Sequence, residues 1–414
     1  MCKFKSNKQS MAITITSSPA PYSSMHDNLW FVSSSTNSGT TNFKFVYDVY
    51  INGSQVIRSK VFPSPSAEGR YGVFDAAPIV RSSVTNYFEP SGNSILVASN
   101  DKIKVDYQVR IGEEVSGVTT TNLASGSYSA YNFVPPLFAD VFFMESQTYL
   151  DLATYYSSLQ LENFKDNFLT ERDLDNIAIE YGDNFYASYL KITAGTYSAF
   201  VEVVNESEAV TSTVSGNITL SGQFNLFNLE ASHINTFAGS TIINASTYGY
   251  NFYLKRGATQ SRVIKLRQKC YPKFQQYNLQ FLNRLGGWET KSFTLVNKRS
   301  SEYERTSYRR NDWQLVGGQM KNSDVYNKFN ETTFNYAIQH KDKYRLTSDW
   351  VTEQDYAWLA QLVSSPIVYM EVLGAYFPIT ISQTNYEYKI ESADKLFNFE
   401  IEIEVGRYLT SQFR

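Results

Sequence analysis

Hydrophobic and polar residues alternate with a period of two along several segments of this chain. In Phe397–Val405 every odd-numbered position is apolar, and the positions between them are Asn or Glu. Ile103–Ile111 and Phe43–Ile51 repeat the alternation, and the second of these runs directly into Asn52-Gly53, a pair that suits a tight hairpin turn. A period of two places apolar side chains on one face of a strand and polar ones on the other. The pattern therefore predicts antiparallel sheets with one solvated face.

The turn-rich segments between these strands divide the chain into three predicted domains. Residues 12–140 should form an N-terminal β-sandwich with a long polar loop, because short strand patterns alternate there with turn signals. Residues 141–256 should form a short helical bridge and a second β-rich domain. Residues 257–414 should form a C-terminal β-meander domain with one helix. The predicted fold class is thus mainly β and multidomain, with antiparallel β-sandwiches.

Two segments show helical spacing instead of alternation. Between Glu145 and Phe168, apolar residues recur every three or four positions, which predicts one or two short helices. Thr352 followed by Asp355 resembles a capping box at a helix start, and Ser364-Ser365-Pro366 should end that helix. A meander with a short turn at Leu373-Gly374 should follow it.

The segment Val115–Ala130 is rich in Ser, Thr and Gly. This composition predicts either a long hairpin loop or an exposed arm. A flexible arm that becomes ordered on a neighbouring chain can lock an assembly. We therefore treat the segment as a candidate contact.

Composition places the chain among soluble globular proteins with a sizeable core. It has 414 residues, of which 42% are hydrophobic and 19% charged, with a mean hydropathy of -0.34. Residues 1–250 carry 14 basic and 23 acidic residues, whereas residues 251–414 carry 23 and 17. Such uneven charge suits stacking against a neighbour, or a mildly basic contact face.

No targeting or membrane segment is predicted. The N-terminal lysines are not followed by an apolar stretch, because Ile13 and Ile15 alternate with threonines, so no signal peptide is expected. No run approaches the ~18–20 apolar residues of a membrane span. Cys2 and Cys270 are far apart in sequence, and we expect no structural disulfide between them.

The search for chemistry yields no site. His26, His233 and His340 have no second His or Cys at metal-ligand spacing, and no phosphate-binding loop, dinucleotide fingerprint or serine-nucleophile motif is present. The acidic stretch from Glu171 to Asp183 lacks the pattern of a calcium loop and should form a solvated turn. We predict no enzymatic activity, no cofactor, and no catalytic, cofactor-binding or metal-ligating residue.

Two basic clusters and an excess of aromatic residues are the remaining candidates for binding. The clusters would suit a nucleic-acid groove, but the alternation at Arg262–Arg267 favours an edge strand with a charged outer face. They consist of Arg262, Lys265, Arg267, Lys269 and Lys273, and of Lys298, Arg299, Arg305, Arg309 and Arg310. The chain also has 28 Phe, 31 Tyr and 5 Trp. Tyrosines such as Tyr50 and Tyr388 fall at strand positions that alternate with the predicted buried ones. This placement favours a protein interface over a platform for sugar rings.

Five segments carry a family resemblance: Phe281–Thr290 with Phe293, Asp349–Val405, Asn42–Pro65, Tyr107–Glu114 and, more weakly, Phe168–Leu190. They resemble virion structural proteins of tailed bacteriophages, especially those of Bacteroidota hosts. The resemblance covers about two thirds of the chain, and its motifs are structural, so it implies assembly. From the residues alone, Gly286-Gly287 should supply backbone angles or a close approach that a side chain would block.

These observations lead to one expectation and two alternatives. We expect a structural component of a tailed-phage virion, in the tail (tube or ring), collar or baseplate, present as a homo-oligomeric ring that contacts other virion proteins. It would be assembled in the cytoplasm of the bacterial host, with no membrane partner, and with nucleic acid involved only if the genome passes a basic face. The alternatives are a glycan-binding adsorption protein of the same particle and, less favoured, a glycoside hydrolase with an acidic pair.

Overall fold

The computed structural model describes eleven stretches of the chain and confirms the mainly β fold class. The described residues are 13–66, 69–85, 88–124, 126–134, 167–191, 193–269, 273–309, 313–322, 333–382, 396–405 and 409–410. They divide into two compact units: Met1–Lys269 with Asn283–Glu289, and Cys270–Leu282 with Thr290–Arg414. None of the helices in these stretches has the length and apolar character that crossing a bilayer requires.

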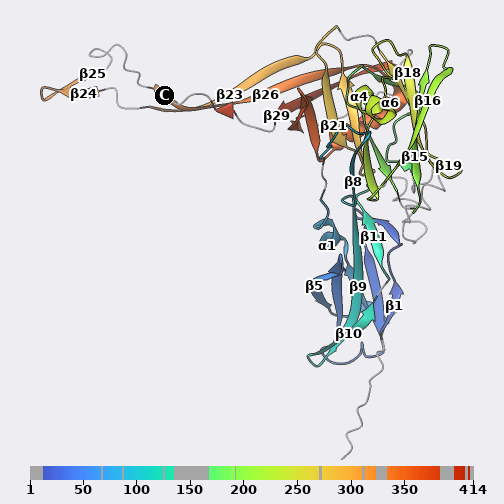
Figure 1. Ribbon diagram of the computed structural model, residues 1–414. Coiled ribbons are helices and arrows are strands. Elements are labelled where there is room, and N and C mark those ends of the chain that lie inside the picture. Colours follow the sequence, from blue (N-terminus) through green and yellow to red (C-terminus); the bar gives the residue numbers. More distant parts are fainter. Residues whose placement is uncertain are drawn as a thin grey trace, which may run out of the picture. The chain divides into compact units, whose positions relative to one another are not determined.

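The first unit begins with a β-sandwich (Figure 1). One sheet has the order β1-β3-β7-β6, and the other has the order β2-β11-β9-β4-β5 with β10 paired to β9. Phe31 from the first sheet and Phe45, Tyr47 and Ile111 from the second share one buried core. The strands are β1 (Ile13–Ser17), β2 (Tyr22–Ser24), β3 (Trp30–Ser35), β4 (Lys44–Ile51), β5 (Ser54–Val61), β6 (Ser64–Ser66), β7 (Gly69–Asp75), β9 (Lys104–Val115), β10 (Val118–Ala124) and β11 (Tyr128–Tyr131), and helix α1 is Ala77–Arg81.

A second pair of sheets completes this unit. Their orders are β12-β14-β17-β8 and β13-β20-β18-β15-β16, with β19 paired to β18. Tyr189 and Phe227 from one sheet and Val201 and Phe252 from the other meet in a second core. The elements are β8 (Leu96–Asn100), β12 (Asn167–Phe168), β13 (Ile177–Ile179), β14 (Tyr186–Leu190), β15 (Tyr197–Val204), β16 (Val210–Ile218), β17 (Phe224–Asn228), β18 (Gly249–Arg256), β19 (Thr259–Gln260), β20 (Ile264–Gln268) and helix α4 (Ala231–Ala238).

The second unit is built on one large sheet with the order β22-β21-β27-β28-β29-β26-β23, with β30 paired to β26. Leu359 and Leu362 of helix α6 pack with Phe399 and Ile401 of β29 in its core. The elements are β21 (Tyr277–Leu282), β22 (Trp288–Phe293), β23 (Lys298–Arg309), β26 (Thr333–Thr352), α6 (Glu353–Ser364), β27 (Val368–Val372), β28 (Ala375–Ile381), β29 (Leu396–Val405) and β30 (Leu409–Thr410); a separate hairpin consists of β24 (Trp313–Val316) and β25 (Gln319–Asn322).

Several local predictions are confirmed. Phe399 and Ile403 of β29 are buried while Glu400 and Glu402 are exposed. Asn52 and Gly53 have φ angles of 49° and 81° in the turn between β4 and β5. At the start of α6 the Thr352 hydroxyl accepts a hydrogen bond from the Asp355 N–H at 3.2 Å, as the predicted cap requires. The helices predicted between Glu145 and Phe168 fall mostly outside the described residues.

Two interpretations of the sequence were wrong. For the segment Val115–Ala130 the alternative of an exposed arm is wrong, and a paired hairpin stands in place of the long hairpin loop, because β10 pairs with β9 from Val118↔Val115 to Ala124↔Arg110. Ser116 and Gly117, with φ angles of 50° and 83°, form the tight turn that permits this pairing. The strand at Ile264–Gln268 is not an edge strand, since β20 lies between β13 and β18.

The three predicted domain ranges remain a prediction, but strand pairing crosses two of their borders. β8 lies within the range 12–140 and pairs with β17 of the second pair of sheets. β20 lies within the range 257–414 and also belongs to the second pair of sheets. Hydrophobic alternation defines a strand, but it does not specify which sheet the strand joins.

Candidate interaction surface

The most distinctive feature of the second unit is a long two-stranded ribbon made by β23 and β26 (Figure 1). Their antiparallel register runs from Lys298↔Arg345 to Arg309↔Thr333, which spans about 40 Å at the usual rise per residue. On its other side β26 pairs with β29 from Lys343 onward and with β30 at Gln339 and His340. Among the described residues, the stretch 333–338 of β26 is therefore paired with β23 alone. We call β23 and residues 333–345 of β26 the ribbon.

The ribbon exposes aromatic side chains. Every residue of β23 is exposed. Tyr303, Tyr308 and Tyr336 are 53%, 52% and 57% exposed, and the rings of Tyr308 and Tyr336 lie 6.1 Å apart. The ring of His340 stacks on Tyr303 at 5.3 Å, and the Arg305 guanidinium lies 5.6 Å from the same tyrosine ring. These side chains give the ribbon an aromatic surface that water covers in the isolated chain.

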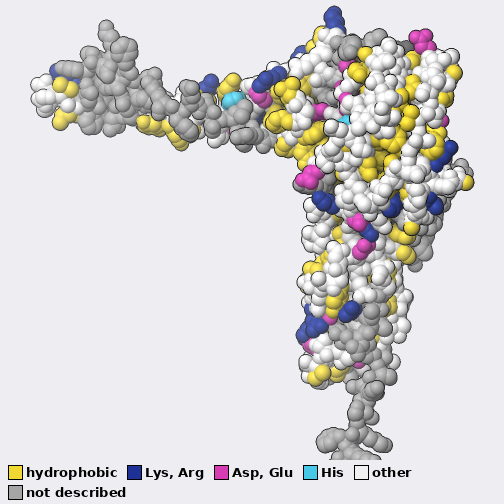
Figure 2. Space-filling model, in the orientation of Figure 1, with side chains coloured by type: hydrophobic (Ala, Val, Ile, Leu, Met, Phe, Trp, Pro, Cys, Tyr) yellow, Lys and Arg dark blue, Asp and Glu magenta, His cyan; other side chains and the backbone are white. Residues whose placement is uncertain are grey.

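Ion pairs join the ribbon to its neighbour β29 and connect its own strands. The Lys343 ammonium lies 2.6 Å from Glu302 across the ribbon and 3.2 Å from Glu404 of β29. The hydrogen bond from Lys343 lowers the pKa of Glu302. Asp342 accepts from the Ser301 hydroxyl at 2.6 Å and pairs with Arg299, and these contacts lower its pKa. Figure 2 accordingly shows Lys or Arg side chains and Asp or Glu side chains close together on the ribbon.

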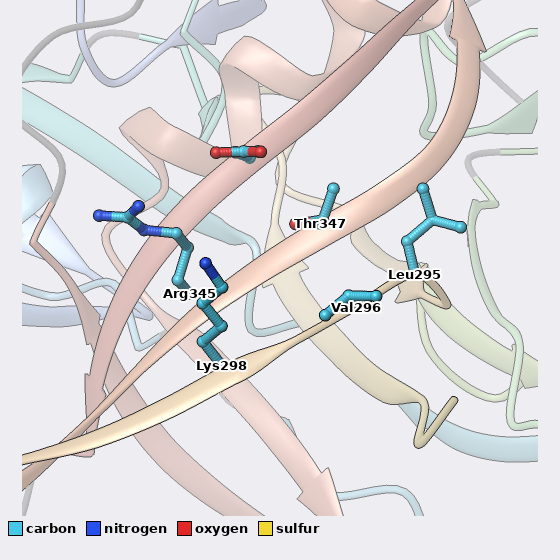
Figure 3. Close-up of a pocket in the computed structure, with 6 residues that line it drawn as sticks. Leu295, Val296, Lys298, Arg345 and Thr347 are labelled. Carbon is cyan, nitrogen blue, oxygen red and sulfur yellow. The ribbon is translucent and has the colours of Figure 1, made fainter. Parts of the chain in front are cut away.

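A pocket of about 400 Å³ lies where the ribbon leaves the sheet. Figure 3 shows Lys298 and Arg345 on one side of it and the apolar Leu295 and Val296 on the other, with Thr347 between them. Glu400 completes the lining. The Arg345 guanidinium already binds Glu402, with Nε 2.9 Å from the carboxylate. The pocket therefore offers a basic rim and an apolar wall beside the aromatic ribbon.

The first basic cluster is divided between the two units. Arg262, Lys265, Arg267 and Lys269 lie in the first unit, whereas Lys273 and the second cluster lie in the second unit. Arg267 is 7% exposed and binds Glu208, and its Nη1 donates to the Asn251 side chain at 3.1 Å. Lys265 pairs with Asp175 at 2.8 Å. Internal ion pairs thus neutralise two charges of the first cluster, while most of the second cluster lies on the ribbon; Arg310 falls outside the described residues.

His26 and His233 have ordinary hydrogen-bond partners, whereas His340 stacks on Tyr303 of the ribbon. His26 Nε2 lies 2.8 Å from Asn132 Oδ1, and His233 Nδ1 lies 2.8 Å from the Ser94 carbonyl. Glu171 pairs with Arg284. Burial raises the pKa of Glu180 to about 7. Within the described ranges, no three His, Cys, Asp or Glu side chains gather where they could hold a metal ion.

The glycine pair packs as its sequence suggested. Gly286 has a φ of 77°. A Cβ on Gly287 would lie 2.5 Å from the Leu169 carbonyl oxygen. Asn283, which the sequence did not single out, organises this turn: its Oδ1 accepts from the N–H groups of Leu285 at 3.0 Å and Gly287 at 2.8 Å. The segment is a packing determinant, and it offers no exposed binding group.

Comparisons with known proteins leave the family open. No family model and no curated protein matches the chain. Among solved structures, the FN1–FN3 domains of chicken CNTN1 align with 61% of this chain and 66% of their own, just under two thirds, at 11% identity and a TM-score of 0.16. That score is too low to support an argument about fold or function.

Proposed function

We propose that this protein is a structural component of a tailed-phage virion, in the tail, collar or baseplate, and that it works by protein–protein assembly, as a homo-oligomeric ring. The segments that resemble phage virion proteins support the assignment of the chain to a phage particle. The ribbon supports assembly, and it is the observation that carries the proposal.

The physical argument concerns the stability of the ribbon. Two strands without a third element beside them are only marginally stable in water. Ion pairs such as Glu302–Lys343 are exposed and contribute little, because solvent screens them. Tyrosine is enriched at interfaces, where its ring is buried and its hydroxyl keeps a polar partner. A neighbouring chain that covers the ribbon would bury Tyr303, Tyr308 and Tyr336 and stabilise the extended strands.

The same tyrosines could stack on sugar rings, so the test has to separate assembly from glycan adsorption. We would compare the full chain with the triple variant Tyr303→Ala/Tyr308→Ala/Tyr336→Ala by analytical ultracentrifugation, mass photometry and negative-stain imaging. The parent chain should form rings at micromolar concentration, and the triple variant should not. Because the three side chains are exposed, the thermal midpoint should stay unchanged.

A matched control replaces Tyr181 and Tyr248, which are 40% and 37% exposed and lie in the first unit. Their substitution by Ala should leave the rings intact. A parent chain that stays monomeric and binds a glycan array through the ribbon tyrosines would refute assembly and support adsorption. For the particle itself, gold-labelled antibody against the chain should mark the tail end of phage from the lysate; absence of the chain from purified particles would contradict the virion assignment.

A further inference from the structure

The longest described edge strand without a charged residue is β16. It pairs with β15 from Tyr197↔Ile218 to Val204↔Val210 and, within the described part of the chain, with no strand on its other side. Figure 1 shows it at the margin of its sheet. Six of its nine residues are exposed, at positions 210–213, 215 and 217, and the other three are partly buried. Its outer backbone groups are therefore available to another strand.

This edge has few of the devices by which proteins usually prevent strand addition. Such devices include charged side chains, proline, short length and bulges, and of these β16 has a bulge at Thr211, between the pairs Val203↔Ser212 and Val204↔Val210. From Ala209 to Leu229 the sequence contains no Lys, Arg, Asp or Glu, and β16 contains no proline. The exposed edge strand β23, in contrast, carries six charged residues in twelve positions. An uncharged edge that keeps a regular register over seven residues, Ser212–Ile218, is a template for pairing.

The sequence of β16 is also chemically symmetric about its centre. Reading outward from Val214, the pairs are Thr213 with Ser215, Ser212 with Gly216, Thr211 with Asn217, and Val210 with Ile218. Hydroxyl groups are thus matched with hydroxyl or amide groups, small residues with small ones, and apolar ends with apolar ends. In an antiparallel pair related by a twofold axis normal to the sheet, the residues from Ser212 to Gly216 would lie opposite each other in this way, whereas the bulge at Thr211 interrupts the regular pairing beyond them.

We propose that β16 pairs with β16 of a second copy of this chain, antiparallel and centred on Val214. The contact joins the two sheets that contain β16 into one continuous sheet across the twofold axis. Val214 lies on the inner face of the sheet, because it is paired with the buried Val201; Thr213 and Ser215 therefore lie on the outer face. Gly216 also lies on the inner face. A Cβ at Gly216 would be 3.1 Å from Phe237 of α4, so α4 already covers the inner face there. The inference does not depend on the proposed virion function.

Paired charges test both the contact and its register. The background is the full chain with the three ribbon tyrosines replaced by Ala, so that ribbon contacts do not contribute. In Thr213→Lys/Ser215→Lys, each lysine faces a lysine of the other copy; in Thr213→Lys/Ser215→Glu, each lysine faces a glutamate. The Lys/Lys dimer contains two repulsive pairs and the Lys/Glu dimer two attractive ones. The dimer dissociation constant of the Lys/Lys variant should therefore exceed that of the Lys/Glu variant by about tenfold or more.

The background chain should dimerise in sedimentation equilibrium, the Lys/Lys variant should be monomeric, and the Lys/Glu variant should dimerise. If the Lys/Lys and Lys/Glu variants associate equally, or if the background chain is monomeric at about 100 µM, the proposal is wrong. Circular dichroism confirms that each variant is folded. If the ribbon variants still form rings, the difference in association between the Lys/Lys and Lys/Glu variants still tests the β16 contact, so the two proposals fail separately.

A cysteine at the centre gives a second readout. With Cys2 and Cys270 replaced by Ser, Val214→Cys places two thiols opposite each other, at a Cα separation of about 4.5–5.5 Å that a disulfide can bridge. Mild oxidation should yield a covalent dimer. Val210→Cys is the control, because eight residues along the strand separate the two copies of position 210 by roughly 25 Å. Equal crosslinking of both variants, or none at position 214, would overturn the symmetric register.

Discussion

Removing the Asn283 side chain should destabilise the first unit more than any exposed substitution. Asn283 is 3% exposed. Its amide Nδ2 donates to the Leu169 carbonyl and to the Glu289 carboxylate, each at 2.7 Å, and its Oδ1 accepts the N–H groups of Leu285 and Gly287. Asn283→Ala therefore deprives four buried groups of a partner at once.

The magnitude follows from those four groups. Each buried polar group left without a hydrogen bond costs about 1–3 kcal/mol. Glu289 is itself 6% exposed, so its carboxylate cannot simply turn to bulk solvent. Water that enters the space left by the amide would satisfy some of the groups, so we expect a loss of about 3–5 kcal/mol in the free energy of unfolding. For a unit of this size that loss lowers the thermal midpoint by about 10 °C.

The assay is calorimetry combined with amide hydrogen exchange, because a chain with two units need not unfold in one transition. The transition of the first unit should shift, and the amides of Leu285 and Gly287 should lose protection. Asn93→Ala is the control, since Asn93 is exposed in a turn. A shift for Asn283→Ala no larger than that for Asn93→Ala would show that the network does not stabilise the turn.

Three further perturbations have defined outcomes. Gly287→Ala should destabilise the first unit by about 1–3 kcal/mol through overlap with the Leu169 carbonyl, while Gly39→Ala, whose Cβ meets nothing nearer than 3.7 Å, should be near neutral in the same calorimetric scan. Glu180→Gln should raise the free energy of unfolding at pH 8 but not at pH 4. Because the pKa of Glu180 is raised to about 7 in the folded protein, the protein loses stability as the pH rises from about 4.5 through 7, and glutamine removes this loss. Equal effects at both pH values in urea titrations would contradict this. Thr352→Ala should cost about 1 kcal/mol in the second unit by removing the cap of α6, and Thr352→Ser should restore it.

The sequence could predict those elements whose signal is local. The alternation in Ile103–Ile111 was sufficient because buried side chains alternate there with partly or fully exposed ones, and the same holds for residues 398–404 within the predicted strand Phe397–Val405. The Asn52-Gly53 turn and the Thr352 cap were also predictable, because their geometry depends on residues a few positions apart. Long-range pairing leaves no such local signal.

The errors have physical causes in particular residues. Arg267 suggested an edge strand because guanidinium groups are seldom buried, but Glu208, Asn251 and the backbone satisfy it inside the sheet. Ser116-Gly117 forms a hairpin turn although Ser rarely adopts positive φ. Asn283 was overlooked because its four hydrogen bonds connect segments more than a hundred residues apart as well as its own turn. No periodicity in one segment reports such contacts.

The ribbon escaped prediction for a different reason, which also bears on how it works. A strand that is wet on both faces has no hydrophobic period, so Lys298–Arg309 resembled a charge cluster. Its alternating charges make it a poor template for indiscriminate strand addition, whereas its tyrosines offer side-chain contact. β16 has the opposite chemistry, with an uncharged backbone edge and no exposed aromatic ring. The two surfaces should therefore select different partners: the ribbon a side-chain pocket or groove, and β16 a strand. If both contacts form, mutations in one should leave the other's stoichiometry unchanged.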